Sequence, residues 1–312
     1  MQAVGSLFSM GEYVKAVTGP VHMVDFGGNG ESIVLVHGLG GSTTNWIAVA
    51  DGLARHGRVL ALDLPGFGLS PPGRDYRLET HREAIENFIE LEGAPATLIG
   101  NSTGGLLSQM VAGHRPDLVD RLVLVAPATP PVLPDPRLDW PTAIRLALQA
   151  TPGFGTAYGR RFINSHSAEE LVRLSLEMIT HRKGRVPLDV IEASIDMARI
   201  RKDLPWSAEA TARTATSIAA FYANRANYIR MIRSIKAPTL VVQGVSDHIV
   251  SPTAVERICS LRPDWKLVQM SDTGHTPQMD APLRFLAVLE HWLSEIGARQ
   301  SVPDLLVGKV PS

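Results

Sequence analysis

The sequence has very little cysteine, almost no net charge and no long apolar run. Its 312 residues include one cysteine, Cys259, which excludes an internal disulfide and a cysteine-rich metal site. The 30 basic and 31 acidic residues give a formal net charge of -1, so no footprint for nucleic acid is indicated. Because no run of about 18 apolar residues occurs, we expect no membrane-spanning helix and no stable membrane insertion.

The first residues of the chain also lack a recognisable targeting pattern. A secretory signal peptide combines a basic start with a long apolar stretch and a cleavage site. Residues 1–7, Met-Gln-Ala-Val-Gly-Ser-Leu, do not have this combination. A cytoplasmic location is therefore the expectation.

Short apolar runs rich in β-branched residues recur along the chain. Most of them are apolar throughout, as strands buried on both faces of a parallel sheet are. Helical patterns lie between these runs, and the alternation predicts an α/β fold with a mostly parallel, doubly wound sheet. The predicted strands are residues 21–26, 33–36, 59–62, 97–99, 122–125, 239–242 and 266–270, and the clearest helices are 46–55, 78–91, 104–114, 253–261 and 283–296.

One long segment interrupts this alternation. It opens with a cluster of prolines and continues with helix-period patterns at 168–176 and 190–195. We predict a helical cap at residues 130–231, inserted into a core domain of residues 1–129 and 232–299, with a C-terminal tail at 300–312. Seven aromatic side chains could line a pocket or fill the core of the cap: Trp140, Phe154, Tyr158, Phe162, Trp206, Phe221 and Tyr222.

The sequence around Ser102 carries the strongest indication of chemistry. Residues 100–105 read Gly-Asn-Ser-Thr-Gly-Gly and lie between a predicted strand and a helical run. This is a G-x-S-x-G elbow in the strand, turn and helix context that it requires. The glycines leave room for a tight turn, which holds the serine at a helix N-terminus whose dipole favours negative charge. We predict that Ser102 is a nucleophile.

A serine nucleophile needs a base, and His275 is the candidate. It follows the last predicted strand, at the carboxyl edge where open α/β sheets collect their active-site groups. Asp247, which follows the preceding strand, is predicted to orient the imidazole and to stabilise its protonated form. The chain order Ser102, Asp247, His275 is the order expected on this fold. Asp272 and Asp280 lie nearer to His275 in the sequence, but their turn-rich surroundings favour loop and helix capping.

Acyl transfer also needs backbone N–H groups directed at the oxygen of the tetrahedral intermediate. Thr103, the residue after the nucleophile, is predicted to supply one of them. The second is predicted to come from the glycine-rich loop after strand 33–36, from Leu39 or, as the alternative, from Gly40. His37 is expected to support this loop rather than to titrate during catalysis.

With these residues, the chain resembles the cap-bearing serine esterases of the α/β-hydrolase superfamily over residues 21–296. Residues 37–40, His-Gly-Leu-Gly, resemble the oxyanion segment of that family, and residues 63–70 resemble its D-x-P-G-x-G-x-S loop. The elbow, the Asp247 loop and Gly274-His275-x-Pro277 match in the same order. The resemblance implies an α/β-hydrolase fold and a cap that covers the active site and shapes its pocket.

The leading hypothesis is a serine hydrolase that cleaves a carboxylic ester of a small to medium substrate through an acyl-enzyme. Ser102 attacks the carbonyl, and His275 takes the proton and returns it to the leaving alcohol. This carboxylesterase-like reaction needs no cofactor and no metal. The expected partner is a small-molecule ester, and the oligomeric state stays open.

Two alternatives stay open. Carbon–carbon hydrolases of the meta-cleavage product type share the Gly-Asn-Ser-x-Gly-Gly elbow, although their oxyanion loop typically contains a proline that this chain lacks. Such an enzyme needs a cap that binds a substrate carboxylate, for which the candidates are Arg160, Arg161, Arg199 and Arg201. A non-catalytic ligand receptor that retains the fold is the other alternative. Haloalkane dehalogenases and epoxide hydrolases carry an aspartate nucleophile, so Ser102 argues against both.

Overall fold

Eight strands form a single sheet in the computed structural model, which describes residues 11–16, 19–135, 137 and 139–300. Along the sheet the order is β1-β2-β4-β3-β5-β6-β7-β8; β1 and β2 run antiparallel to their neighbours, and all other pairs are parallel. The predicted mostly parallel sheet is therefore confirmed. The strands are β1 (Gly11–Ala16), β2 (Gly19–Gly27), β3 (Ser32–Val36), β4 (Arg58–Leu62), β5 (Ala96–Asn101), β6 (Val119–Val125), β7 (Thr239–Gly244) and β8 (Lys266–Met270).

Helices cover both faces of this sheet and fill the connection between β6 and β7. None of the helices in the described part of the chain has the length and apolar character that a bilayer crossing needs. Two short segments, η1 (Thr43–Trp46) and η2 (Lys183–Arg185), are 3-10 helices. The α-helices are α2 (Ile47–Leu53), α3 (Leu78–Glu92), α4 (Thr103–His114), α5 (Trp140–Gln149), α6 (Phe154–Asn164), α7 (Ala168–Ile179), α8 (Leu188–Asp203), α9 (Ser207–Tyr222), α10 (Arg225–Ser234), α11 (Pro252–Cys259), α12 (Pro277–Asp280) and α13 (Pro282–Gln300).

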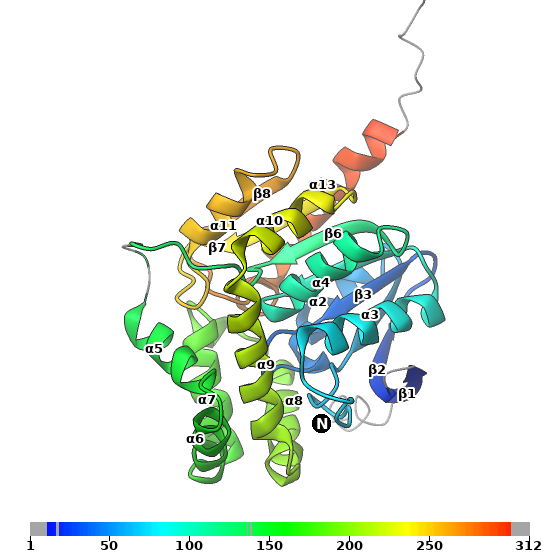
Figure 1. Cartoon of the computed structure of the whole chain (residues 1–312). Helices are drawn as coiled ribbons and strands as arrows, with labels where there is room; N and C mark the ends of the chain where they lie inside the picture. The colour runs from blue at the N-terminus through cyan, green and yellow to red at the C-terminus, as the bar shows by residue number, and fades with distance from the viewer. Residues whose placement is uncertain (1–10, 17–18, 136, 138, 301–312) are drawn as a thin grey trace, which may run out of the picture.

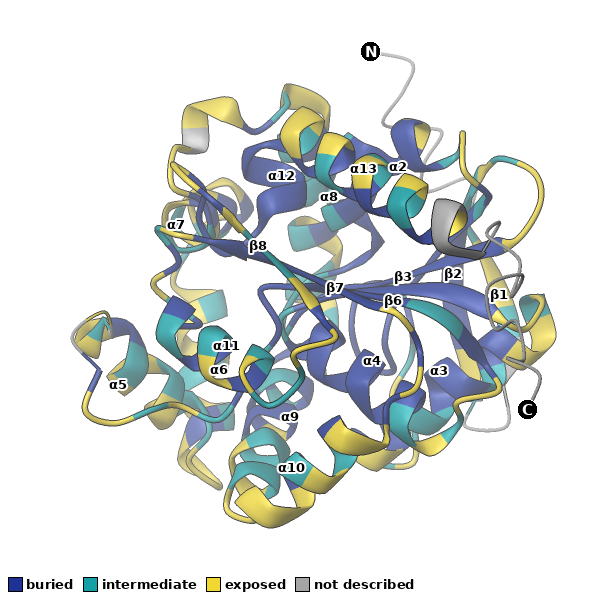
Figure 2. Cartoon of the chain, turned by 90° about the horizontal axis from the view of Figure 1, so that it is seen from above, coloured by how far each residue is buried: buried dark blue, intermediate teal, exposed yellow. Residues whose placement is uncertain are grey.

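The central strands divide their side chains between two hydrophobic cores. Successive residues of a strand point to opposite faces of the sheet. In β3, Val34 and Val36 pack in the core beneath α3 and α4, whereas Ile33 and Leu35 pack in the core beneath α2 and α13. Figure 2 shows this arrangement, with α2 and α13 on one side of the sheet and α3 and α4 on the other. The two-sided burial explains why these strands read as nearly continuous apolar runs.

The helical insertion between β6 and β7 is also confirmed, as α5–α9, and Figure 1 shows these helices gathered at one end of the molecule. Within it α6 packs closely on α9, where a Cβ on Gly159 would lie 3.6 Å from the Cβ of Ala208. The following helix, α10, packs on α4. The domain boundaries at 129/130 and 231/232 stay predictions. The predicted tail, 300–312, lies outside the described residues except for Gln300, which ends α13.

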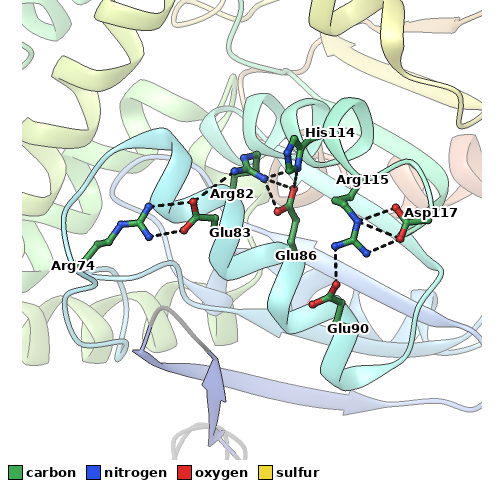
Figure 3. Close-up of polar contacts among 8 residues, drawn as sticks. All are labelled: Arg74, Arg82, Glu83, Glu86, Glu90, His114, Arg115 and Asp117. Carbon is green, nitrogen blue, oxygen red and sulfur yellow. Dashed lines mark hydrogen bonds and ion pairs between the residues drawn. The ribbon is translucent and has the colours of Figure 1, made fainter.

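Ion pairs join α3 to the end of α4, on the outer side of the core that these two helices cover (Figure 3). Glu86 accepts from Arg82 one turn earlier in the same helix, at 2.5 Å, and its other partner is His114 at the end of α4, at 2.9 Å. Farther along the same helix, Glu90 pairs with Arg115 at 2.7 Å. These contacts fix α3 against α4, the helix that begins directly after Ser102.

Candidate active site

Ser102 lies on the turn between β5 and α4 in a strained backbone conformation, with φ of 54° and ψ of -119°. Residues with a side chain rarely adopt a positive φ, and such outliers persist where surrounding structure holds them. Here the Ser102 N–H donates to the carbonyl of Val125 at 2.9 Å, and the Ser102 carbonyl accepts from the N–H of Ala128 at 2.9 Å. The end of β6 and the residues after it therefore impose the turn.

The glycines of the elbow are required by close backbone contacts. A Cβ on Gly100 would lie 2.3 Å from the carbonyl oxygen of Gly104, and a Cβ on Gly104 would lie 2.2 Å from the carbonyl oxygen of Val36. Both distances are far below any real carbon–oxygen contact. The first turn of α4 can therefore approach β3 and β5 only because these residues lack side chains.

Asp247 and His275 are brought together at the carboxyl ends of β7 and β8. Oδ2 of Asp247 lies 2.8 Å from Nδ1 of His275, and both residues are buried. The same carboxylate accepts from the N–H groups of Ile249 (2.8 Å) and Val250 (3.0 Å) and from Nε2 of Gln243 (2.9 Å). Three donors other than His275 surround this carboxylate, and an ionised carboxylate only accepts, so we assign the proton of His275 to Nδ1. Its Nε2 is then left as the basic nitrogen.

His275 is held next to the elbow through Asn101. The side-chain amide of Asn101 donates to the His275 carbonyl at 3.1 Å and to the Val125 carbonyl at 3.0 Å. Within the described residues, no hydrogen bond joins the Ser102 hydroxyl to the His275 imidazole. In enzymes without substrate this contact is often long, and it tightens when the substrate binds. The structure therefore joins Asp247 to His275 directly. Ser102 is linked to this pair through Asn101, the residue before it, which donates to the His275 carbonyl.

The insertion holds the backbone of His275 from the other side. The carbonyl of Ile179, at the end of α7, accepts from the N–H groups of His275 (2.8 Å) and Thr276 (3.2 Å). The fully buried Asp280 accepts from the N–H groups of Gly274 (2.7 Å) and His181 (2.8 Å) through one oxygen, Oδ2. The expected capping role of Asp280 thus extends beyond its own loop to the insertion.

Asp272 differs from Asp280 in its exposure and in its contacts. Its carboxylate is exposed and lies 3.9 Å from the imidazole of His181. Its backbone has a φ of 50°, a conformation that Asp and Asn tolerate better than other residues with side chains. Asp272 is therefore a surface turn residue, as its turn-rich surroundings suggest.

The predicted oxyanion loop, residues 37–41, lies directly against Ser102. A Cβ on Gly38 would lie 3.0 Å from the Cβ of Ser102. The Gly41 N–H donates to the Gly38 carbonyl at 3.0 Å, which closes a turn over Leu39 and Gly40. The φ of 74° at Gly40 is the value that a type II turn demands at this position. The loop therefore lies beside Ser102, and the role of the N–H groups of Leu39 and Thr103 in an oxyanion hole stays a prediction.

His37 supports the loop from below. Its Nε2 accepts from the N–H of Leu64 at 3.0 Å, so the proton lies on Nδ1, which donates to the Gly38 carbonyl at 2.7 Å. Burial lowers the pKa of His37 because a charged imidazole would lose its hydration. The residue is thus held neutral as a structural bridge.

Of the four arginines considered for carboxylate binding, Arg201 reaches the loop. Nη1 of Arg201, on α8, donates to the carbonyl of Gly40, and burial lowers the pKa of its guanidinium. Arg199, two residues earlier, is exposed and pairs with Glu169 and Asp196. Arg160 and Arg161 are exposed on α6. The sequence offers no signal that separates Arg201 from the other three, because the difference arises from how α8 packs.

The chain belongs to the α/β hydrolase fold family, whose sequence profile matches residues 31–282. "Lipase 1" of Psychrobacter immobilis is 28% identical over 81% of this chain and 73% of its own length. A 2-hydroxy-6-oxo-2,4-heptadienoate hydrolase of Pseudomonas putida is 27% identical over 86% of this chain and 90% of its own length. The solved structure of a thermophilic esterase from Thermogutta terrifontis superposes with a TM-score of 0.69, at 23% identity, over 92% of this chain and 98% of that one.

Proposed function

We propose that this member of the family is a serine hydrolase that cleaves a carboxylic ester of a small to medium substrate. The observation that carries the proposal is the buried bond between Asp247 and His275 beside a strained Ser102. An aspartate that accepts from Nδ1 leaves Nε2 of the histidine free to take a proton. Relatives named as lipases and a structural neighbour named as an esterase support the ester as the bond that is cleaved.

In the proposed mechanism the Ser102 oxygen attacks the ester carbonyl while Nε2 of His275 takes the hydroxyl proton. The negative charge that develops on the carbonyl oxygen is stabilised by the N–H groups of Leu39 and Thr103. Thr103 is the first residue of α4, where a backbone N–H has no acceptor within the helix. His275 then gives its proton to the leaving alcohol, and an acyl group remains on Ser102. Water repeats the sequence, which releases the acid and restores the hydroxyl.

The test is the turnover of short p-nitrophenyl esters by Ser102→Ala. We expect a loss of about 10⁴-fold or more, because the nucleophile is removed while the fold is kept. Ser260→Ala, which changes the exposed serine that caps the C-terminus of α11, is the control and should retain full activity. A fluorophosphonate probe should label the wild-type protein and not Ser102→Ala. Unchanged turnover by Ser102→Ala would refute the assignment, and an unlabelled wild-type serine would favour a receptor.

A second candidate is a carbon–carbon hydrolase whose substrate carries a carboxylate. Its support is the half-buried Arg201 at the predicted oxyanion loop, together with the relative named as a 2-hydroxy-6-oxo-2,4-heptadienoate hydrolase. The two reactions are separated by assaying a ring-fission product beside neutral esters. In the carbon–carbon case Arg201→Gln should raise KM for the carboxylate substrate far more than for a neutral ester.

A further inference from the structure

The first helix of the insertion exposes a stripe of large apolar side chains. Trp140, Ile144 and Leu148 are spaced four residues apart in α5, so they lie on one face of the helix. Their exposed fractions are 59%, 56% and 41%. Thr142 is buried, so α5 contacts the rest of the insertion through a different face. The stripe therefore belongs to no hydrophobic core of the described chain.

The next helix also exposes large apolar side chains. Phe154 and Phe162 are exposed in α6, and Phe154 stacks on Tyr158 with ring centroids 5.9 Å apart. In Figures 1 and 2, α5 lies at the periphery of the molecule, at the outer side of the insertion. We call residues 140–164 the α5–α6 hairpin. An apolar surface of this kind on a globular protein marks a contact with another molecule or with a membrane.

The charge of the hairpin is of one sign. Residues 140–164 contain Arg145, Arg160 and Arg161 and neither aspartate nor glutamate. All three arginines are exposed. Asp139, the N-cap of α5, lies just outside this segment and accepts from the N–H of Thr142 at 3.1 Å. The chain as a whole has a net charge of -1, so the hairpin is a local concentration of positive charge.

We propose that the α5–α6 hairpin is a peripheral docking surface for an anionic phospholipid bilayer. Apolar side chains on one face of a surface helix, with arginines beside them, favour a position at the boundary between headgroups and acyl chains. Trp140, Ile144 and Leu148 enter that boundary, and the arginines reach the lipid phosphates. A second copy of this chain fits less well, because a twofold contact through the hairpin would bring the same positive charges together.

The stripe begins across a hollow from the loop that carries Asp247. A surface hollow of about 330 Å³ separates the start of α5 from the loop after β7, and its lining includes Arg137, Asp139, Val245 and Asp247. Val245 is an exposed apolar residue on the far rim of this hollow. A bilayer in contact with α5 therefore lies beside the loop that carries the proposed catalytic acid.

The test measures binding to vesicles rather than hydrolysis. Full-length Ser102→Ala protein, in which lipid cleavage cannot interfere, is sedimented with vesicles of phosphatidylcholine alone or with 30% phosphatidylglycerol added, about the anionic content at which polybasic segments bind. We expect binding to the anionic vesicles that high salt weakens. Ile144→Glu should reduce the partition coefficient by about tenfold or more, because it places a charge among the apolar contacts. Leu283→Glu, at an 81% exposed leucine of α13, is the matched control and should bind like the parent protein.

The arginines are tested separately. The double variant Arg160→Gln, Arg161→Gln should weaken binding to anionic vesicles by about fivefold for each arginine and leave the weak binding to phosphatidylcholine unchanged. Light scattering after size exclusion determines the oligomeric state of the same proteins. The proposal is overturned if anionic vesicles do not bind the parent protein, if Ile144→Glu binds as well as Leu283→Glu, or if Ile144→Glu dissociates a dimer that itself does not bind vesicles. Because no step depends on catalysis, these results are independent of the proposed ester cleavage.

Discussion

Replacing Asp280 with asparagine should reduce both stability and turnover, although Asp280 makes no contact with a substrate in the proposed mechanism. Its Oδ2 accepts from Gly274 and His181, and these two bonds tie the residue before His275 to the end of α7. Asparagine keeps the shape and one carbonyl oxygen, but it removes the negative charge and puts an amide nitrogen where Oδ1 accepts from the N–H of Arg182 at 3.4 Å. The two bonds then become neutral hydrogen bonds in a fully buried site.

The expected loss of stability follows from these two bonds. A hydrogen bond to an ionised group contributes about 1.5–3 kcal/mol, and a neutral one about 1 kcal/mol, so each bond loses about 1 kcal/mol. Asp280→Asn should therefore lower the free energy of unfolding by about 2 kcal/mol. If a similar amount is lost in positioning His275, kcat falls by about tenfold to thirtyfold, since 1.4 kcal/mol corresponds to a factor of ten. KM should change little, because the substrate-contacting groups are kept.

Urea unfolding and p-nitrophenyl ester kinetics measure these two effects. Asp272→Asn is the matched control, since it removes an exposed carboxylate from the same loop and should change neither quantity measurably. A positioning role also predicts that kcat of Asp280→Asn stays low without urea and at temperatures far below its unfolding transition. If Asp280→Asn unfolds earlier but turns over like the wild type, Asp280 stabilises the fold without positioning His275, and the reasoning is wrong.

Three further predictions concern other parts of the molecule. Gly38→Ala places a Cβ 3.0 Å from that of Ser102. Steady-state kinetics should show a loss of kcat of about tenfold or more, and the free energy of unfolding should change by about 1 kcal/mol. An unchanged kcat would show that the loop moves to accommodate the methyl group. Burial lowers the pKa of His81 to about 3 from its ordinary 6.5. The unfolded chain therefore takes up a proton that the folded one refuses as the pH falls below 6.5, and stability falls toward pH 3 by up to about 1.4 kcal/mol per pH unit. His81→Gln should flatten this slope in urea titrations, and an unaltered slope would contradict the assignment. Glu86→Gln, at a side chain 9% exposed, should cost about 1–2 kcal/mol, whereas Glu90→Gln, at one 43% exposed, should cost less than about 0.5 kcal/mol; equal losses would contradict the burial argument.

The parts of the fold that sequence reasoning predicted are those with local signals. Strands buried on both faces read as apolar runs, and the elbow around Ser102 is a contiguous motif whose glycines are demanded by contacts only a few residues away. β1 was not predicted, because Gly11–Ala16 is an edge strand with exposed residues such as Tyr13 and has no apolar run. An edge strand is specified mainly by its pairing with β2, which a pattern within the strand does not reveal.

The parts that escaped prediction depend on contacts between distant segments. Arg199 and Arg201 are equivalent in the sequence, yet Arg199 is exposed, whereas Arg201 is half-buried and contacts the predicted oxyanion loop. Trp140 was considered for the lining of a pocket or for the core of the cap, yet it is 59% exposed and belongs to no hydrophobic core of the described residues. The position of Ser102 relative to His275 also depends on how the insertion packs. The sequence therefore predicts which residues form the candidate site, but not how they lie relative to one another.

The backbone hydrogen bond between the end of α7 and His275 has a consequence for engineering. The group that accepts from His275 is the main-chain carbonyl of Ile179, which every amino acid supplies. Side chains at this position can therefore vary without removing the bond, and libraries that diversify α7 should retain an active scaffold as long as the path of the chain is kept. A graft that replaces the insertion with one from a relative must instead reproduce the course of residues 179–182, or the backbone of His275 loses this contact. An attempt to change the substrate preference by exchanging the whole insertion is thus limited by the path of the main chain at residues 179–182, and not by which side chains stand there.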